Sequence, residues 1–100
     1  MILPLTFMLL SALFGPTCKP TAPGETLAIP TEQAAVTAAK AAWYGKFSTS
    51  AVEEYEPYRA KLEDGVWHVF GSLPPGWRGG TLEAVICASD GKVLKVFHSR

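Results

Sequence analysis

Only two cysteines occur among the 100 residues, and acidic and basic side chains balance at nine each. Two cysteines are too few for the disulfide framework that stabilises many small secreted domains. A zero net charge without a basic stripe argues against nucleic acid as a partner. No group of Cys, His, Asp and Glu has the spacing of metal ligands, and no glycine loop precedes a helix as a phosphate-binding loop does. The sequence therefore predicts a chain without a metal or another cofactor.

The apolar run at the amino terminus is short. Residues 1–14 carry no charged side chain, but a membrane span takes about 20 residues. The run fits a secretory signal peptide better, although no Lys or Arg precedes it and Pro4 interrupts it. A short membrane anchor and a buried first helix are the alternatives. We expect residues 1–17 to be a signal peptide or a short anchor. The protein would then be exported to the periplasm, or tethered in a bacterial envelope, with membrane contact only through this segment.

The two cysteines have different expected roles. Cys18 follows the apolar run closely, as the lipid-bearing cysteine of a bacterial lipoprotein does. Residues 15–17 (Gly-Pro-Thr) depart from the small-residue pattern of such a site, so lipidation at Cys18 is only weakly indicated. If Cys18 is cleaved off or lipidated, Cys87 has no partner within the chain. Because Cys87 lies inside a predicted strand, we expect a packed, unreactive thiol there.

A proline-rich segment precedes the predicted domain. Residues 15–30 contain four prolines and two glycines, and proline resists both helix and central strand. We therefore expect a tether over residues 18–30 and a single domain over residues 31–100.

A helix is predicted at the start of this domain. Thr31 is a suitable cap, and six alanines between residues 34 and 42 favour helix. Gly45 is a suitable stop. One face of this helix carries Ala35, Ala39, Ala42 and Trp43.

The pattern after this helix changes to a period of two. A short helical turn over residues 50–55, capped by Ser48 or Ser50, is expected before Pro57. Asp-Gly pairs at 64–65 and 90–91 predict two tight turns. The predicted strands cover residues 58–63, 66–73, 81–88 and 93–98. The fold class is therefore α+β, with an N-terminal helix packed on a four-stranded antiparallel sheet and an export segment before it.

The two faces of the predicted sheet differ in character. The face toward the helix carries Trp67, Val69, Leu73, Leu82, Ala84, Ile86, Leu94 and Val96. The second face carries His68, Phe70, Glu83, Val85, Cys87, Val93, Lys95 and Phe97. So much apolar surface is usually covered in a small domain. The cover is either the segment 47–56, a partner protein, or a second copy of the chain, which would make a homodimer.

The polar residues of the second face do not indicate catalysis. General acid–base chemistry needs groups within hydrogen-bond reach in a site that excludes water, and the sequence predicts neither, so we expect no enzyme. Trp77 and Arg78 lie in a loop bounded by prolines and glycines, and Trp and Arg are enriched where interfaces gain most energy. The alternative is that Trp77 folds back onto the core. The candidate partner-binding residues are His68, Phe70, Trp77, Arg78, Glu83 and Lys95.

Several short blocks of sequence resemble a known family. They lie at residues 57–62, 64–69, 71–74, 79–80, 83, 86 and 90–94. In order and spacing they resemble the small bacterial immunity proteins with a nuclear-transport-factor-2-like fold, over about two-thirds of the chain. The resemblance implies a protein that binds and neutralises a cognate toxin and has no catalytic residues. It also implies a structural role for Trp67 and an interface role for Glu83.

A second function is compatible with the pattern. Small antiparallel sheets of this kind also resemble peptidase-propeptide-like domains. The alternative function is therefore an envelope protein that modulates or inhibits a peptidase, or a structural lipoprotein.

Overall fold

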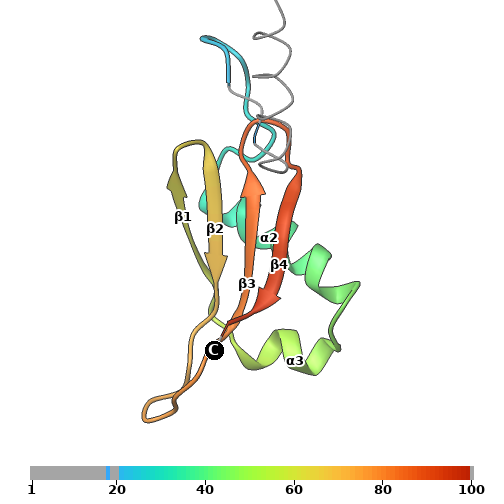
Figure 1. The fold of residues 1–100 in the computed structure, drawn as a ribbon, viewed down its shortest axis with the longest axis vertical. Helices are drawn as coiled ribbons and strands as arrows, with labels where there is room; N and C mark the ends of the chain where they lie inside the picture. Colours follow the sequence, from blue (N-terminus) through green and yellow to red (C-terminus); the bar gives the residue numbers. More distant parts are fainter. Residues whose placement is uncertain (1–17, 19–20, 100) are drawn as a thin grey trace, which may run out of the picture.

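The computed structural model describes residue 18 and residues 21–99. Two helices, α2 (Glu32–Tyr44) and α3 (Thr49–Glu54), precede four strands. The strands are β1 (Arg59–Glu63), β2 (Val66–Phe70), β3 (Leu82–Cys87) and β4 (Val93–His98). They form one antiparallel sheet in chain order, and α2 packs across one of its faces (Figure 1). The predicted α+β class and the helix on a four-stranded antiparallel sheet are confirmed.

Helix α2 begins and packs as its sequence predicts. The Thr31 hydroxyl oxygen accepts a hydrogen bond from the Ala34 N–H at 3.1 Å, which satisfies one of the free donors of the first turn. Ala35 and Ala39 are fully buried, and their small side chains bring the helix close to the sheet. Trp43 is fully buried at the other end, where its ring packs at a tilt of 37° against Tyr58 with centroids 4.6 Å apart.

Helix α3 packs against α2 at one end of the sheet, and it does not cover the second face (Figure 1). Its cap is Ser48, whose hydroxyl accepts from the Ala51 N–H at 3.2 Å. Val52 is fully buried with the residues on the α2 side of the sheet, and the Tyr58 hydroxyl donates to its carbonyl at 2.6 Å. The suggestion that residues 47–56 cover the second face is therefore wrong, because the core on the α2 side already holds this segment.

The first hairpin turn is the predicted one. Asp64 and Gly65 have φ angles of 52° and 77°, which are both positive, as a two-residue type I′ turn requires.

Strand β2 ends earlier than predicted, at Phe70. The Gly71 N–H donates to the Thr81 hydroxyl at 3.0 Å, and the Ser72 N–H donates to the Tyr55 carbonyl at 2.8 Å. These bonds draw the backbone out of the sheet ladder. Leu73, which we predicted in the core, therefore lies in the β2–β3 loop (residues 71–81) and is partly exposed.

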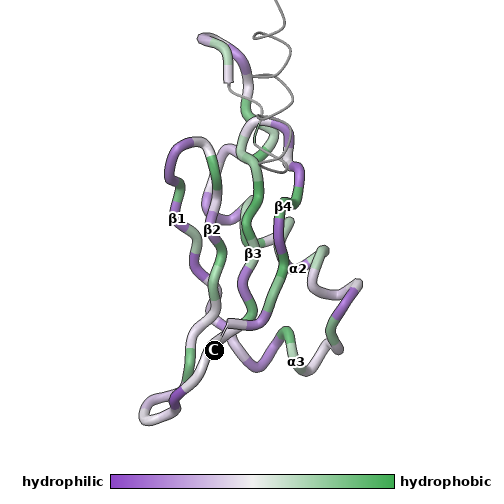
Figure 2. Tube along the Cα trace, viewed as in Figure 1, coloured by the Kyte–Doolittle hydropathy of each residue, from purple (hydrophilic) through white to green (hydrophobic). Residues whose placement is uncertain are grey.

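The core lies between α2 and the middle of the sheet. Five of the predicted core residues are buried there: Trp67, Val69, Leu82, Ala84 and Ile86. Figure 2 shows β3 as largely hydrophobic along its length, which fits its central position. A register shift at Val85 and Ile86 pairs Val93 with Ile86. Val93 was predicted on the second face; the irregularity interrupts the predicted alternation at the start of β4, where Val93 is 39% exposed.

The segment before α2 contacts the domain. The Ile29 N–H donates to the Ala88 carbonyl at 3.0 Å, and the Trp67 indole N–H donates to the Ile29 carbonyl at 2.8 Å. Leu27 and Ile29 pack against the core.

The two cysteines form a disulfide, Cys18–Cys87, which closes 69 residues of chain. The expected free thiol at Cys87 is therefore wrong. A sulfur in a disulfide cannot also carry a lipid thioether, so the two states of Cys18 exclude each other, and lipidation stays a prediction. The predicted signal segment, residues 1–17, lies outside the described residues. Within the described part, no helix has the length and apolar character needed to cross a bilayer.

Candidate functional site

The second face of the sheet presents two neighbouring rows of side chains, because residues paired across strands share a face. Phe70, Glu83 and Phe97 are paired across β2, β3 and β4 and form one row. The next row consists of His68, Val85 and Lys95. We call these six residues the open-face patch. Four of the predicted partner-binding residues, His68, Phe70, Glu83 and Lys95, are thus brought together.

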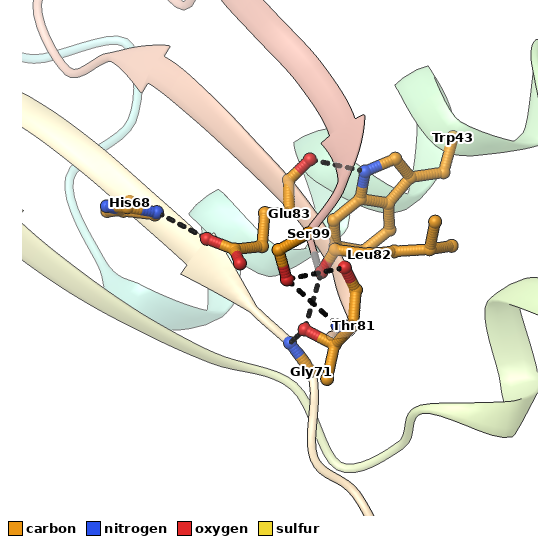
Figure 3. Close-up of polar contacts among 7 residues, drawn as sticks. All are labelled: Trp43, His68, Gly71, Thr81, Leu82, Glu83 and Ser99. Atoms are coloured by element: carbon orange, nitrogen blue, oxygen red, sulfur yellow. Dashed lines mark hydrogen bonds and ion pairs between the residues drawn. The ribbon is translucent and has the colours of Figure 1, made fainter. Parts of the chain in front are cut away.

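Glu83 is held from both sides of the sheet (Figure 3). Its carboxylate oxygen lies 2.7 Å from His68 Nε2 on the open face, and its backbone carbonyl accepts from the Trp43 indole N–H at 3.0 Å. The Glu83 side chain is 18% exposed and the His68 side chain is 51% exposed. Glu83 is therefore the more buried member of the pair, and His68 is the member that faces solvent.

Aromatic rings flank the charged groups of the patch. The His68 and Phe70 rings meet edge to face with centroids 6.4 Å apart. Lys95 Nζ lies 4.6 Å above the centroid of the Phe97 ring, within the range of a cation–π interaction. The patch therefore offers aromatic carbon and charge of both signs side by side.

The open face is hollowed beside the patch. A cavity of about 530 Å³ extends from the edge strand to the base of the β2–β3 loop. Lys61 and Glu63 of β1, which sequence reasoning did not select, line it together with His68 and Glu83. The alternation along β1 could have identified them, since Lys61 is paired with His68.

Trp77 and Arg78 lie apart from the patch, in the β2–β3 loop beyond the end of the sheet (Figure 1). Trp77 is 65% exposed, so the alternative that it folds back onto the core is wrong. Both residues line a second cavity, of about 290 Å³, which also borders Tyr55 and His98. No local sequence signal connects these last two, because they lie 43 residues apart.

Thr81 and Ser99 close the base of the loop (Figure 3). The Thr81 N–H donates to the Ser99 hydroxyl at 3.0 Å, and the Ser99 N–H donates to the Thr81 carbonyl at 2.9 Å. The Thr81 hydroxyl also accepts from the Gly71 N–H. These bonds fix both ends of the loop to the sheet.

Among residues 18 and 21–99, no group of three or more His, Cys, Asp and Glu side chains is placed to hold a metal ion. The His68–Glu83 pair lies on an open surface and not in an enclosed pocket. The sheet is thus covered by a helix on one face and presents an aromatic and charged patch on the other.

The comparison with known families gives the particular class. A family model described as NTF2 fold immunity protein matches residues 34–100, which include all four strands and most of α2. The chain belongs to this family, and the resemblance found in the sequence is confirmed. Membership supports an immunity function. No curated protein and no solved structure gave a significant match to the chain.

Proposed function

We propose that this protein binds a cognate toxin and neutralises it, with the open-face patch as the main contact surface. The observation that carries the proposal is the double row of aromatic and charged side chains on a face that no described helix or strand covers. Family membership supports a toxin as the partner.

The aromatic part of the patch resembles the composition of protein interfaces. Interfaces are enriched in aromatic residues, and their strongest positions are surrounded by contacts that exclude water. Phe70 and Phe97 supply the apolar area and lie on either side of Glu83. Lys95 and the His68–Glu83 pair at 2.7 Å supply charges that orient a partner.

The protein acts in this proposal by occupying the toxin and not by catalysis. A general acid or base works on a substrate proton from a site that excludes water. The His68 side chain is half exposed on an open surface, where a partner can cover it. A binding role is therefore the better account of this pair.

The place of action in this proposal is outside the cytoplasm. Disulfides persist in the periplasm and are rare in the cytosol, and the Cys18–Cys87 disulfide supports the periplasm. The apolar run over residues 1–14 supports export.

Rescue of toxicity is the direct test of the function. A candidate toxin, chosen from toxin genes beside the gene for this chain, is expressed in the periplasm of a test bacterium together with the full chain or an empty vector. We expect growth only with the full chain. Growth arrest in both cultures, with no complex in a binding assay, would exclude the toxin-neutralising function for that pair. A pull-down with the tagged full chain tests the alternative function. Recovery of an envelope peptidase would favour a role as a peptidase modulator or inhibitor.

Charge reversal tests the contact surface. Lys95→Glu should weaken toxin binding about tenfold or more, because it places an anion beside Glu83 in the patch. Lys46→Glu is the matched control, since it makes the same charge change at an exposed residue after α2. Equal affinities of the two variants would show that the patch is not the contact surface. The remaining possibility is that a second copy of the chain covers this face. Light scattering on the free protein measures its molar mass and would detect such a homodimer.

The mass of the exported protein tests the state of Cys18. Cells that express the full chain should yield a periplasmic protein without free thiols and without an acyl chain. A lipid adduct at Cys18 would exclude the disulfide and would place the protein on the membrane.

A further inference from the structure

The β2–β3 loop, the end of α3 and His98 line a cavity of about 290 Å³ beyond the end of the sheet. It is distinct from the hollow beside the open-face patch, although Gly79 and Gly80 line both. A partner that covers the patch can therefore reach this cavity along a continuous surface.

A turn in the loop positions the backbone of Trp77 at this cavity. The Trp77 N–H donates to the Pro74 carbonyl at 3.1 Å and closes a turn around Pro75 and Gly76. Gly76 has a φ of +83°, which the third position of a type II turn requires. At the base of the loop, the Ser72 hydroxyl donates to the Pro57 carbonyl at 2.7 Å. An exposed tryptophan is thus presented by a short turn on an anchored loop.

Tyr55 and His98 also line the cavity, and their polar groups are already hydrogen-bonded to each other. The Tyr55 hydroxyl lies 2.9 Å from His98 Nε2, and the two rings meet edge to face with centroids 5.5 Å apart. Leu73 adds apolar surface to the lining. Arg78 forms no hydrogen bond or ion pair with any residue that the structure describes.

We propose that this cavity is the anchor site for an uncharged aromatic side chain of the toxin, an inference that rests on the proposed function. An aromatic ring can stack on the Trp77 indole and meet the Tyr55 edge, and the free Arg78 guanidinium adds a cation–π contact. Glu54 also lines the cavity and opposes an acidic occupant. Trp, Tyr and Arg are the residues most often found at the strongest positions of interfaces.

A small-molecule probe tests the chemistry of the cavity without the toxin. N-acetyl-L-tyrosinamide is titrated into the isotope-labelled, oxidised protein and followed by NMR. We expect saturable shifts of the Trp77 indole N–H and of the Gly79 and Gly80 amides. N-acetyl-L-leucinamide should give weaker shifts. In Trp77→Ala, neither probe should shift the Gly79 and Gly80 amides. Equal responses to the two probes, or no saturation, would overturn the aromatic assignment.

The toxin itself tests the anchor role. Trp77→Ala should weaken toxin binding about thirtyfold or more without unfolding the protein, because Trp77 is 65% exposed. Tyr44→Ala is the matched control: it removes another exposed aromatic side chain, from α2, that lines neither cavity. If the wild-type protein binds the toxin and Trp77→Ala binds equally well, the anchor is wrong and the function stands. If the wild-type protein does not bind, the function fails and the anchor fails with it.

Discussion

Glu32 shows how one exposed carboxylate can join two elements. Its Oε2 atom accepts from Arg59 Nε at 2.8 Å and from the Ala60 backbone N–H at 2.9 Å. Glu32 is the first residue of α2, and Arg59 and Ala60 open the edge strand β1. The hydrogen bond from Arg59, followed by that from Ala60, lowers the pKa of Glu32 below its ordinary value of 4.5. The carboxylate also faces the positive end of the helix dipole.

The acid stability of the protein should report this contact. A carboxyl whose pKa is lowered by folding stabilises the native state above its unfolded pKa, and this contribution disappears as the pH falls through the folded value. Glu32→Gln should therefore be less stable than wild type at pH 7, and the difference should shrink below about pH 4.5. Urea unfolding between pH 2 and pH 7 measures it. Glu53→Gln, at an exposed residue of α3, should parallel wild type. A Glu32→Gln curve that also runs parallel would contradict the prediction.

Single residues of the patch were predictable, and the second cavity was not. Alternation along the strands places His68 and Phe70 on one face, and pairing across the strands then brings Glu83 beside them. Tyr55 and His98 meet only because α3 turns back beneath the end of β4. A sequence pattern records positions within an element, and it carries no information on such distant contacts.

The helices and hairpins follow from local signals. The cap at Thr31, the alanines of α2 and the tight turn at Asp64 and Gly65 depend on local signals, and each was predicted. The end of β2 depends instead on tertiary hydrogen bonds, which the Gly71 and Ser72 N–H groups donate to the Thr81 hydroxyl and the Tyr55 carbonyl. The predicted strand therefore ran three residues too far, to Leu73.

Gly71 allows α3 to lie against the end of the sheet. A Cβ atom at this position would lie 2.6 Å from Tyr55 Cβ and 2.8 Å from Tyr58 Cε1. Neither neighbour can move freely, because Tyr58 is buried against Trp43 and the Tyr55 carbonyl accepts the Ser72 N–H. The absence of a side chain at Gly71 is thus a condition for the position of α3.

Gly71→Ala should destabilise the protein by about 1–3 kcal/mol, the usual cost of forcing an extra carbon into a packed region. Gly45→Ala is the control, because it adds the same carbon where φ is −77° and the nearest atom is 3.5 Å away. We expect that variant to be neutral or stabilised by up to about 1 kcal/mol. Urea unfolding measures both, and hydrogen exchange should show faster opening of α3 in Gly71→Ala. Equal stability of the two variants would mean that the region can relax around the new methyl group.

At the scale of the whole molecule, Cys18 and residues 27–29, before α2, are joined to the folded unit. Ile29 bonds to Ala88 and to the Trp67 indole, and Cys18 is joined to Cys87 at the end of β3. The proline content of this segment predicted a tether because proline excludes regular structure, but it does not exclude packing. The helix and sheet alone are a small unit, and domains of this size bury only about 60% of their chain surface. Additional contacts and a covalent link therefore matter more here than in a larger protein.

The disulfide should provide a large part of the stability. Closing a loop of 69 residues restricts the unfolded chain by at most about 4 kcal/mol in the chain-entropy account. Cys18→Ser should lose a comparable amount, measured by urea unfolding of the oxidised protein. Cys18→Ser is preferable to Cys87→Ser, because Cys87 is fully buried and a hydroxyl there adds a desolvation cost.

A reducing agent should lower the stability of the wild type to that of Cys18→Ser and should leave the variant unchanged. If the reductant did not change the stability of the wild type, and free thiols were present before it was added, Cys18 and Cys87 would not be covalently joined in solution. Among the described residues before α2, residues 27–29 would then hold the segment through their hydrogen bonds and apolar contacts.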